Sequence, residues 1–238
     1  MEVWKLRDLL QTRELYFRRA DKMPDDGDEG IPPKAFMRAH FGVRDEQTEN
    51  NDEASDAQFR EGFYLSCWNV FESESARLWV KFAQFGVAIC SRYALLKSAL
   101  NDLSDNCFLG LTRYGGERLP GRNVLQAIST KHERHRFEHE VRALIWLPDP
   151  HAGINRHFDA ENRAFPRPLT EPTKDIPEYL RRSVNPEKLI TGIVVSPWAS
   201  ADTIGEVAAL LQKTGYSFPI RASELTPYAR FLPKEHFD

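Results

Sequence analysis

Two glutamates separated by one residue are the clearest chemical signal in this chain of 238 residues. Glu138 and Glu140 are followed by a run of apolar residues that favours a strand. Side chains alternate along a strand, so a strand beginning at the glutamates would place both carboxylates on one face. One carboxylate of such a pair can stabilise a positive charge while the other takes a proton from a nucleophile. We therefore expect any catalysis to centre on this pair.

The same segment also fits the pattern H-x-x-E-H, from His135 to His139. Two histidines one helical turn apart would bind zinc there, and the glutamate would activate a water molecule. This zinc hydrolase would need a long continuous helix and a distant third ligand, for which Glu206 or Glu224 could be named. The strand-like residues that follow argue against the helix, so the zinc hydrolase is an alternative and no metal is expected.

The stretch from Glu138 to Val141, with the apolar residues after it, resembles the E-x-E motif of mono-ADP-ribosyltransferases of the R-S-E class. In that family an arginine on an early strand and a serine on a middle strand complete the site. Arg18 and Ser66 match those two positions in this sequence, in the family's order. The resemblance implies an α+β fold with a split sheet, and NAD as the co-substrate.

The resemblance also implies a role for each matched residue. Glu140 would stabilise the oxocarbenium-like state formed when nicotinamide leaves, and Glu138 would deprotonate the acceptor. Arg18 would hold the NAD phosphates, and Ser66 would orient Glu140. Further NAD-binding candidates are the aromatic residues that could stack on nicotinamide, Tyr64 and Trp68.

Two positions depart from the family's pattern. The family's S-T-S is Ser66-Cys67-Trp68 in this chain, and Arg19 competes with Arg18 for the phosphate-binding role. A wider pattern also resembles an uncharacterised bacterial family known only as a domain of unknown function, which implies no activity. The residues that carry this second resemblance are Phe17 to Asp21, Glu29-Gly30, Ser66 to Trp68, Glu74-Ser75 with Trp79, and Phe137 to Glu140.

The residues just before the glutamates suggest the kind of acceptor. Between residues 113 and 142, seven Lys or Arg face four Glu. Lys131, Arg134 and Arg136 could contact phosphates, so RNA or DNA is slightly favoured over protein as the acceptor. By family analogy such an enzyme would be a bacterial toxin or antiphage effector held off by an inhibitory partner. The alternative from another class is a non-catalytic module whose basic segment binds nucleic acid or another partner.

Charge and composition divide the chain unevenly. From residue 21 to 61, twelve acidic residues face five Lys or Arg, which gives −7 and leaves +4 for the rest of a chain of net charge −3. We interpret residues 21–61 as an acidic loop or insertion, and residues 148–187 as a proline-rich irregular region. With no apolar run long enough to span a bilayer and no signal-peptide pattern, we expect a cytoplasmic protein without membrane contact.

Apolar periodicity predicts the elements that must position these residues. Helices are expected over Val3–Leu10, after Ser73, over Tyr93–Leu100, near Asn123–Arg134 and after Asp202, where Ile204, Val207, Ala208 and Leu211 would share a face. Strands are expected over Glu14–Arg19, Gly62–Trp68, Gly86–Cys90, Cys107–Leu111, Glu140–Leu147, Ile190–Val195 and Tyr216–Ile220. The mixed order predicts one α+β domain over residues 1–238, with mixed or antiparallel sheets and flanking helices.

Overall fold

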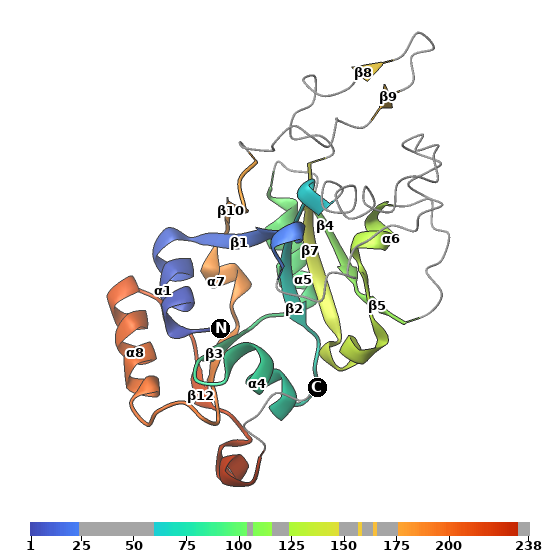
Figure 1. The fold of residues 1–238 in the computed structure, drawn as a ribbon. Helices are drawn as coiled ribbons and strands as arrows, with labels where there is room; N and C mark the ends of the chain where they lie inside the picture. The colour runs from blue at the N-terminus through green and yellow to red at the C-terminus, as the bar shows by residue number, and fades with distance from the viewer. Residues whose placement is uncertain are drawn as a thin grey trace. The chain divides into compact units, whose positions relative to one another are not determined.

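The computed structural model describes residues 1–23, 60–103, 107–115, 124–147, 157–158, 164–165 and 176–232. The protein has the predicted α+β fold, with helices between the strands of mixed and antiparallel sheets (Figure 1). The larger sheet has the strand order β10-β1-β2-β7-β4, and the smaller one β12-β11-β3. The predicted acidic loop, residues 21–61, lies almost wholly outside the described residues, since only residues 21–23 and 60–61 of it are described. No helix in the described part of the chain is both long enough and apolar enough to cross a membrane.

The strands of the larger sheet are β10 (Tyr179–Ser183), β1 (Glu14–Arg19), β2 (Phe63–Asn69), β7 (Glu140–Trp146) and β4 (Cys107–Leu111). Those of the smaller sheet are β12 (Ile220–Ala222), β11 (Gly192–Val195) and β3 (Val87–Cys90). Two short pairs are formed by β5 (Arg113–Tyr114) with β6 (Thr130–Lys131) and by β8 (His157–Phe158) with β9 (Ala164–Phe165). Strand β10 and the β8–β9 pair lie within the region predicted to be irregular, so regular structure does form there.

The helices are α1 (Val3–Thr12), α4 (Ala76–Ala83), α5 (Tyr93–Asn101), α6 (Val124–Ile128), α7 (Pro186–Leu189) and α8 (Thr203–Thr214). The 3-10 helices among the described residues are η1 (Ala20–Lys22), η2 (Glu133–Glu138) and η3 (Thr226–Phe231). The helix expected near Asn123–Arg134 is wrong beyond Ile128, because the chain there enters the short strand β6 and then η2.

The chain divides into two compact units, each assembled from separate stretches of sequence. Unit 1 contains Met1–Tyr16, Phe71–Ser104 and Arg181–Asp238, and unit 2 contains Phe17–Val70 and Asp105–Leu180. Strands β1 and β10 each supply residues to both units.

In unit 1, β11 is the central strand of the smaller sheet, parallel to β12 and antiparallel to β3. Helix α1 packs against α8, and α5 packs against α7. The buried side chains of α8 are Thr203, Val207, Leu210 and Leu211. Ile204, predicted to share the buried face, is instead 41% exposed. The buried face of the helix is therefore rotated slightly from the predicted one.

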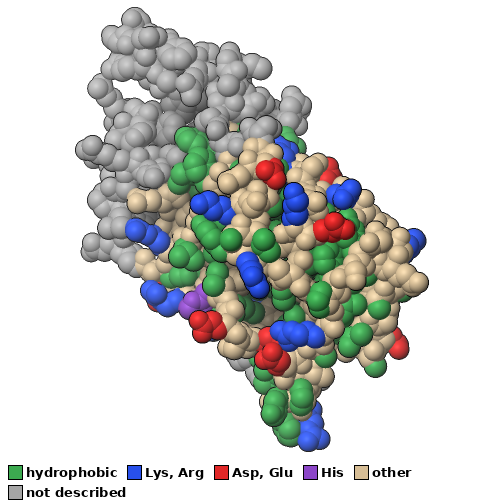
Figure 2. Space-filling view, turned by 180° about the vertical axis from the view of Figure 1, so that it is seen from behind, with side chains coloured by type: hydrophobic (Ala, Val, Ile, Leu, Met, Phe, Trp, Pro, Cys, Tyr) green, Lys and Arg blue, Asp and Glu red, His purple; other side chains and the backbone are tan. Residues whose placement is uncertain are grey.

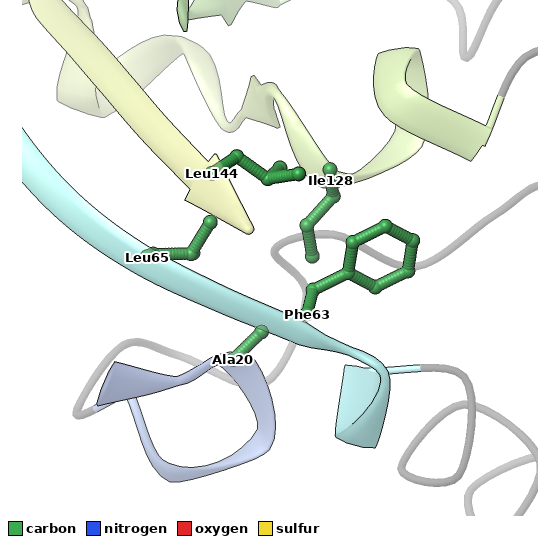
Figure 3. Close-up of a cluster of buried hydrophobic side chains, with 5 residues drawn as sticks. All are labelled: Ala20, Phe63, Leu65, Ile128 and Leu144. Atoms are coloured by element: carbon green, nitrogen blue, oxygen red, sulfur yellow. The ribbon is translucent and has the colours of Figure 1, made fainter. Parts of the chain in front are cut away.

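In unit 2, strand β7 is the central element, with β2 and β4 antiparallel on its two sides. Its period-two alternation separates two faces of the sheet. We call the face that carries Glu140, Arg142 and Leu144 the carboxylate face, and the opposite face, which carries Ala143, the Ser66 face. Part of the carboxylate face is apolar, and Figure 3 shows the cluster there: Ala20, Phe63, Leu65, Ile128 and Leu144. Helix α6, which carries Ile128, thus covers this face and brings the segment after it over the rest of the face.

Candidate functional site

The two candidate glutamates lie on either side of a sharp change in backbone conformation. Glu138 is the last residue of η2, and Glu140 is the first residue of β7. His139 between them has φ 41°, in the left-handed region, and its N–H donates to the carbonyl of Arg136. Our expectation that both glutamates begin the strand is therefore wrong for Glu138. The turn at His139, rather than strand alternation, sets the direction of its carboxylate.

The carboxylates nevertheless converge on one ammonium group. Lys131 Nζ lies 2.8 Å from Glu138 Oε2 and 2.9 Å from Glu140 Oε2. Glu138 is 0% exposed, Glu140 3% and Lys131 4%. The pair is therefore buried and does not face an open cleft. It is closed over by the segment that carries Lys131.

Two more basic side chains complete this buried network. Arg142 Nε lies 2.5 Å from Glu140 Oε1, and the Arg142 guanidinium also donates to the carbonyl of Ile128. His135 Nδ1 lies 3.2 Å from Glu138 Oε1. Buried charges are tolerated when they are paired and hydrogen-bonded, and here two carboxylates balance one ammonium and one guanidinium.

His135 lies between the buried carboxylate of Glu138 and the side chain of Arg134. Its Nδ1 faces Glu138 Oε1, and its Nε2 accepts a hydrogen bond from Arg134 Nε at 3.2 Å. The imidazole ring therefore links the buried network to the exposed Arg134.

The network holds Glu140 as an anion. Burial acts to raise the pKa of Glu140, but the adjacent Arg142 and Lys131 outweigh burial and lower this pKa from 4.5 to about 2. The carboxylate is therefore ionised throughout the physiological pH range.

Residues at the ends of neighbouring strands form hydrogen bonds to the backbone of the turn between Glu138 and Glu140. The Tyr114 hydroxyl accepts a hydrogen bond from the backbone N–H of Glu140 at 2.6 Å. The side-chain amide of Asn69 donates to the backbone carbonyl of Glu138 at 2.8 Å. The backbone N–H of Val70 donates to the carbonyl of His139 at 2.9 Å. Both sides of the turn are thus tied to β5 and to the end of β2.

Ser66 does not join the glutamates. Ser66 pairs with Ala143, whereas Glu140 pairs with Asn69, and directly paired residues point to the same face of a sheet. Ser66 lies three positions before Asn69, an odd number, so Ser66 and Glu140 lie on opposite faces. Ser66 therefore cannot orient Glu140 by a direct hydrogen bond, and Arg142 contacts Glu140 instead.

The two competing arginines differ sharply in their surroundings. Arg19 is 5% exposed, and its Nε and Nη2 bind the two carboxylate oxygens of Asp21 at 2.6 and 3.0 Å. Arg18 is exposed and pairs with Leu65, so it lies on the carboxylate face. Arg19 is committed to Asp21, which leaves Arg18 as the arginine open to a ligand.

The two aromatic candidates lie on the Ser66 face. Tyr64 is 0% exposed, and its hydroxyl donates to the carbonyl of Pro177 at 2.8 Å, so no side of its ring is open for stacking. Trp68 is only partly buried and pairs with Val141. The indole Nε1 of Trp68 is buried and has no acceptor among the described residues.

The three residues expected to contact nucleic acid are not equivalent. Lys131 is buried in the carboxylate network and is not available to a phosphate, so its expected role is wrong. Arg134 and Arg136 are exposed, although Arg136 pairs with Glu133. Figure 2 shows one face of the molecule on which acidic and basic side chains are mixed rather than gathered into a patch of one sign.

The arrangement also differs from the one that the zinc alternative requires. His135 lies in a 3-10 helix, His139 is left-handed, and β7 begins at the next residue. The histidines are therefore not one turn apart on a continuous α-helix, and the H-x-x-E-H match does not form the helix of that motif.

Sequence reasoning missed Arg142 and Tyr114, and it considered His135 only as a zinc ligand. Arg142 could have been found, because it lies two residues after Glu140 in a predicted strand and so must share its face. Tyr114 gave no such signal, since it is 26 residues from Glu140 in sequence. The pairing of β4 with β7 brings its segment to Glu140, where the N–H of Thr112 donates to the Glu140 carbonyl.

A groove of about 700 Å³ in unit 1 contains none of the predicted site residues. Apolar residues such as Leu95, Val184 and Ile190 line it together with polar ones such as Arg13 and Asp102. This groove is therefore a feature separate from the glutamate network.

Comparison with protein-family models, curated proteins and solved structures found no match to this chain. Its function therefore has to be argued from the network itself.

Proposed function

We propose that this chain transfers ADP-ribose from NAD to an intracellular macromolecule, with Glu140 and Glu138 as the catalytic carboxylates. The observation that supports the proposal is the convergence of both carboxylates on Lys131 Nζ, at 2.8 and 2.9 Å. Two carboxylates this close can act on one reacting centre. The E-x-E resemblance supplies the reaction class.

In this reaction the bond between C1′ of the ribose and the nicotinamide nitrogen breaks, and nicotinamide leaves with the electron pair. The ribose then carries an oxocarbenium-like positive charge, which the Glu140 carboxylate stabilises, as in glycoside hydrolysis. An acceptor oxygen or nitrogen bonds to C1′, and Glu138 takes its proton. The lowered pKa of Glu140 keeps its charge available for this role.

The burial of the network adds a requirement to this mechanism. Glu140 is 3% exposed and bonded to both Lys131 and Arg142. A ribose hydroxyl can reach Glu140 only if it replaces one of these cations. The reactive state therefore requires the segment that carries Lys131 to move away from the carboxylate face.

The other residues contribute unequally to NAD binding under this proposal. Arg18 would hold the phosphates, since it is exposed and on the carboxylate face. Arg142 takes the orienting role that the resemblance implies for Ser66. The unused indole N–H of Trp68 lies on the opposite face and does not reach the same ligand directly.

The acceptor under this proposal is RNA or DNA in preference to protein. Arg134 and Arg136 are the exposed cations nearest the glutamates in sequence, and they would contact phosphates without Lys131. A toxin or antiphage effector with an inhibitory partner fits such an activity by family analogy.

A second candidate function is a non-catalytic module that binds nucleic acid or another partner. The burial of the whole network favours it, because a closed ion cluster of this kind can serve the fold alone. The position of Ser66 on the opposite face also favours it. Under this candidate Glu140 stabilises the protein and contacts no substrate.

Nicotinamide release from NAD, with and without added RNA or DNA, separates the two candidates. The purified chain is compared with Glu140→Gln and with Glu133→Gln, which alters an exposed carboxylate of the same segment. Transfer predicts release by the wild type and by Glu133→Gln, and none by Glu140→Gln when that variant is verified as folded by circular dichroism. If the wild type releases no nicotinamide with any acceptor and Glu140→Gln only lowers thermal stability, the second candidate replaces the first.

A further inference from the structure

Strand β4 forms one edge of the larger sheet and has an unusual composition for an edge. Its residues Cys107–Leu111 contain no charged or proline residue, and Leu111 is 69% exposed. Natural proteins commonly protect edge strands with charges, prolines or bulges, because an apolar edge invites pairing with another strand. Within the described parts of the chain, β7 is the one strand that pairs with β4.

The direction of the hydrogen-bonding groups along β4 follows from one bond at its end. The N–H of Thr112 donates to the carbonyl of Glu140 at 2.8 Å, so Thr112 directs its backbone groups toward β7. In an antiparallel strand these groups alternate in direction from residue to residue. Phe108 and Gly110 therefore bond inward to β7, and Leu109 and Leu111 direct their backbone groups outward.

This alternation makes β4 complementary to a second copy of itself. If a two-fold axis passes through Leu109, the two Leu109 residues face each other as a hydrogen-bonded pair and exchange both N–H···O=C bonds. The same register places Leu111 of each copy opposite Cys107 of the other. It also places Phe108 opposite Gly110.

The Phe108–Gly110 pairing fits the shape of the strand. A Cβ built on Gly110 meets no described atom within 4 Å, so the described residues leave space above Gly110. Phe108 is 39% exposed. In antiparallel sheets, an aromatic side chain directly opposite a glycine can cover that glycine. Phe108 of one copy would cover Gly110 of the other in this way.

We propose that two copies of this chain associate through antiparallel pairing of β4 with β4 about an axis at Leu109, joining their larger sheets into one continuous sheet. Pairing through a single short strand gives an interface at the small end of the range for specific complexes. The dimer should accordingly dissociate on dilution. This proposal is independent of the proposed enzymatic function.

A cysteine on the proposed axis gives a positive test. Facing Cα atoms in a hydrogen-bonded antiparallel pair are about 5.5 Å apart, a distance that a disulfide spans. Leu109→Cys should therefore form a covalent dimer under mild oxidation. The matched control is Tyr179→Cys, since Tyr179 lies on β10 at the opposite edge of the same sheet and is 48% exposed. Cross-linking of Leu109→Cys no faster than that of Tyr179→Cys or of the wild type would overturn the proposal.

Sedimentation velocity over a concentration series gives the second test. The wild type should approach twice the monomer mass as concentration rises, and Leu109→Pro should stay at the monomer mass. Proline removes an outward-facing N–H, which edge strands tolerate, so circular dichroism should show a folded chain. A wild type that remains monomeric at the highest concentration, or a folded Leu109→Pro that still dimerises, contradicts the proposal. If Leu109→Pro does not fold, the cross-linking result decides alone.

Discussion

Glu140 owes its ionised state to two cations that lie on either side of its carboxylate group. Arg142 Nε contacts one oxygen at 2.5 Å and Lys131 Nζ the other at 2.9 Å. The spacing of Glu138 and Glu140 predicts that their carboxylates converge. The prediction assumed strand alternation, whereas the turn at His139 brings them together. The burial of the pair could not be predicted, because it depends on Lys131, which looked like an exposed phosphate ligand when only its sequence neighbours were considered.

The depressed pKa of Glu140 makes stability depend on pH in a defined direction. The folded-state pKa of about 2 lies below the ordinary value of 4.5, so this group stabilises the fold above pH 4.5 and loses that contribution as the pH falls toward 2. Urea unfolding at pH 6 and at pH 3 should show that the wild type loses about 2 kcal/mol more than Glu140→Gln over this interval. Equal losses in the two proteins would mean that Glu140 is not held by the network.

Lys131 should prove essential to the fold rather than to nucleic-acid binding. Lys131→Met leaves two buried carboxylates without their shared cation and should lower the free energy of unfolding by about 3–5 kcal/mol. The double variant Lys131→Met/Glu138→Gln should cost less than the sum of its two single variants, because it removes one of the unpaired charges. Denaturant unfolding of all four proteins measures this coupling. Charge removal at the exposed Arg136 is the control and should have little effect, whereas strict additivity at the buried pair would contradict the network.

At the scale of elements, the register of the sheet decides which predicted residues can meet. Strands β1 and β4 have the bounds that apolar patterning predicts. Strands β3 and β7 differ from the prediction by one residue at one end, and β2 is shifted by one residue at both ends. Pattern alone did not reveal that Ser66 faces away from Glu140, because this requires knowing which residue pairs with which. The helix expected near Asn123–Arg134 failed for a related reason. Its last residues are held by pairing with β5 and by the buried network rather than by local helical preference.

The turn between η2 and β7 is a place where local strain can be measured. A left-handed conformation costs a residue with a Cβ atom roughly 1–2 kcal/mol, and glycine adopts it freely. His139→Gly should therefore raise the free energy of unfolding by up to about 1 kcal/mol, since part of the gain is offset by the greater freedom of the unfolded chain. His139→Val should lower it. Thermal unfolding of both variants tests the assignment, and destabilisation by glycine would show that the imidazole of His139 contributes more than its backbone strain.

At the scale of the whole molecule, neither compact unit is a contiguous piece of chain. Our prediction of one domain over residues 1–238 did not anticipate this interleaving, because composition and periodicity report on neighbours in sequence. Unit 1 takes its central strand, β11, from residues beyond 180, although its first helix begins at Val3.

This arrangement predicts the behaviour of a truncated protein. A fragment of residues 1–180 lacks β11, β12, α7 and α8, so β3 has no partner strand from its sheet and α1 has no α8 to pack against. The residues of unit 1 in this fragment should be cleaved rapidly by a protease under conditions in which the full chain resists. Protection of residues 71–104 in the fragment, measured by mass spectrometry of the digests, would contradict this expectation.

The packing of α1 against α8 also has a consequence for synthesis on the ribosome. Helix α1 ends at Thr12, and α8 ends at Thr214. At about 5–20 residues per second, the first helix waits roughly 10–40 s before its partner has been translated. During that interval Leu6, Leu9 and Leu10, which are buried in the finished protein, have no α8 to cover them. We therefore expect the nascent chain to expose this apolar face of α1 to chaperones until α8 has been synthesised.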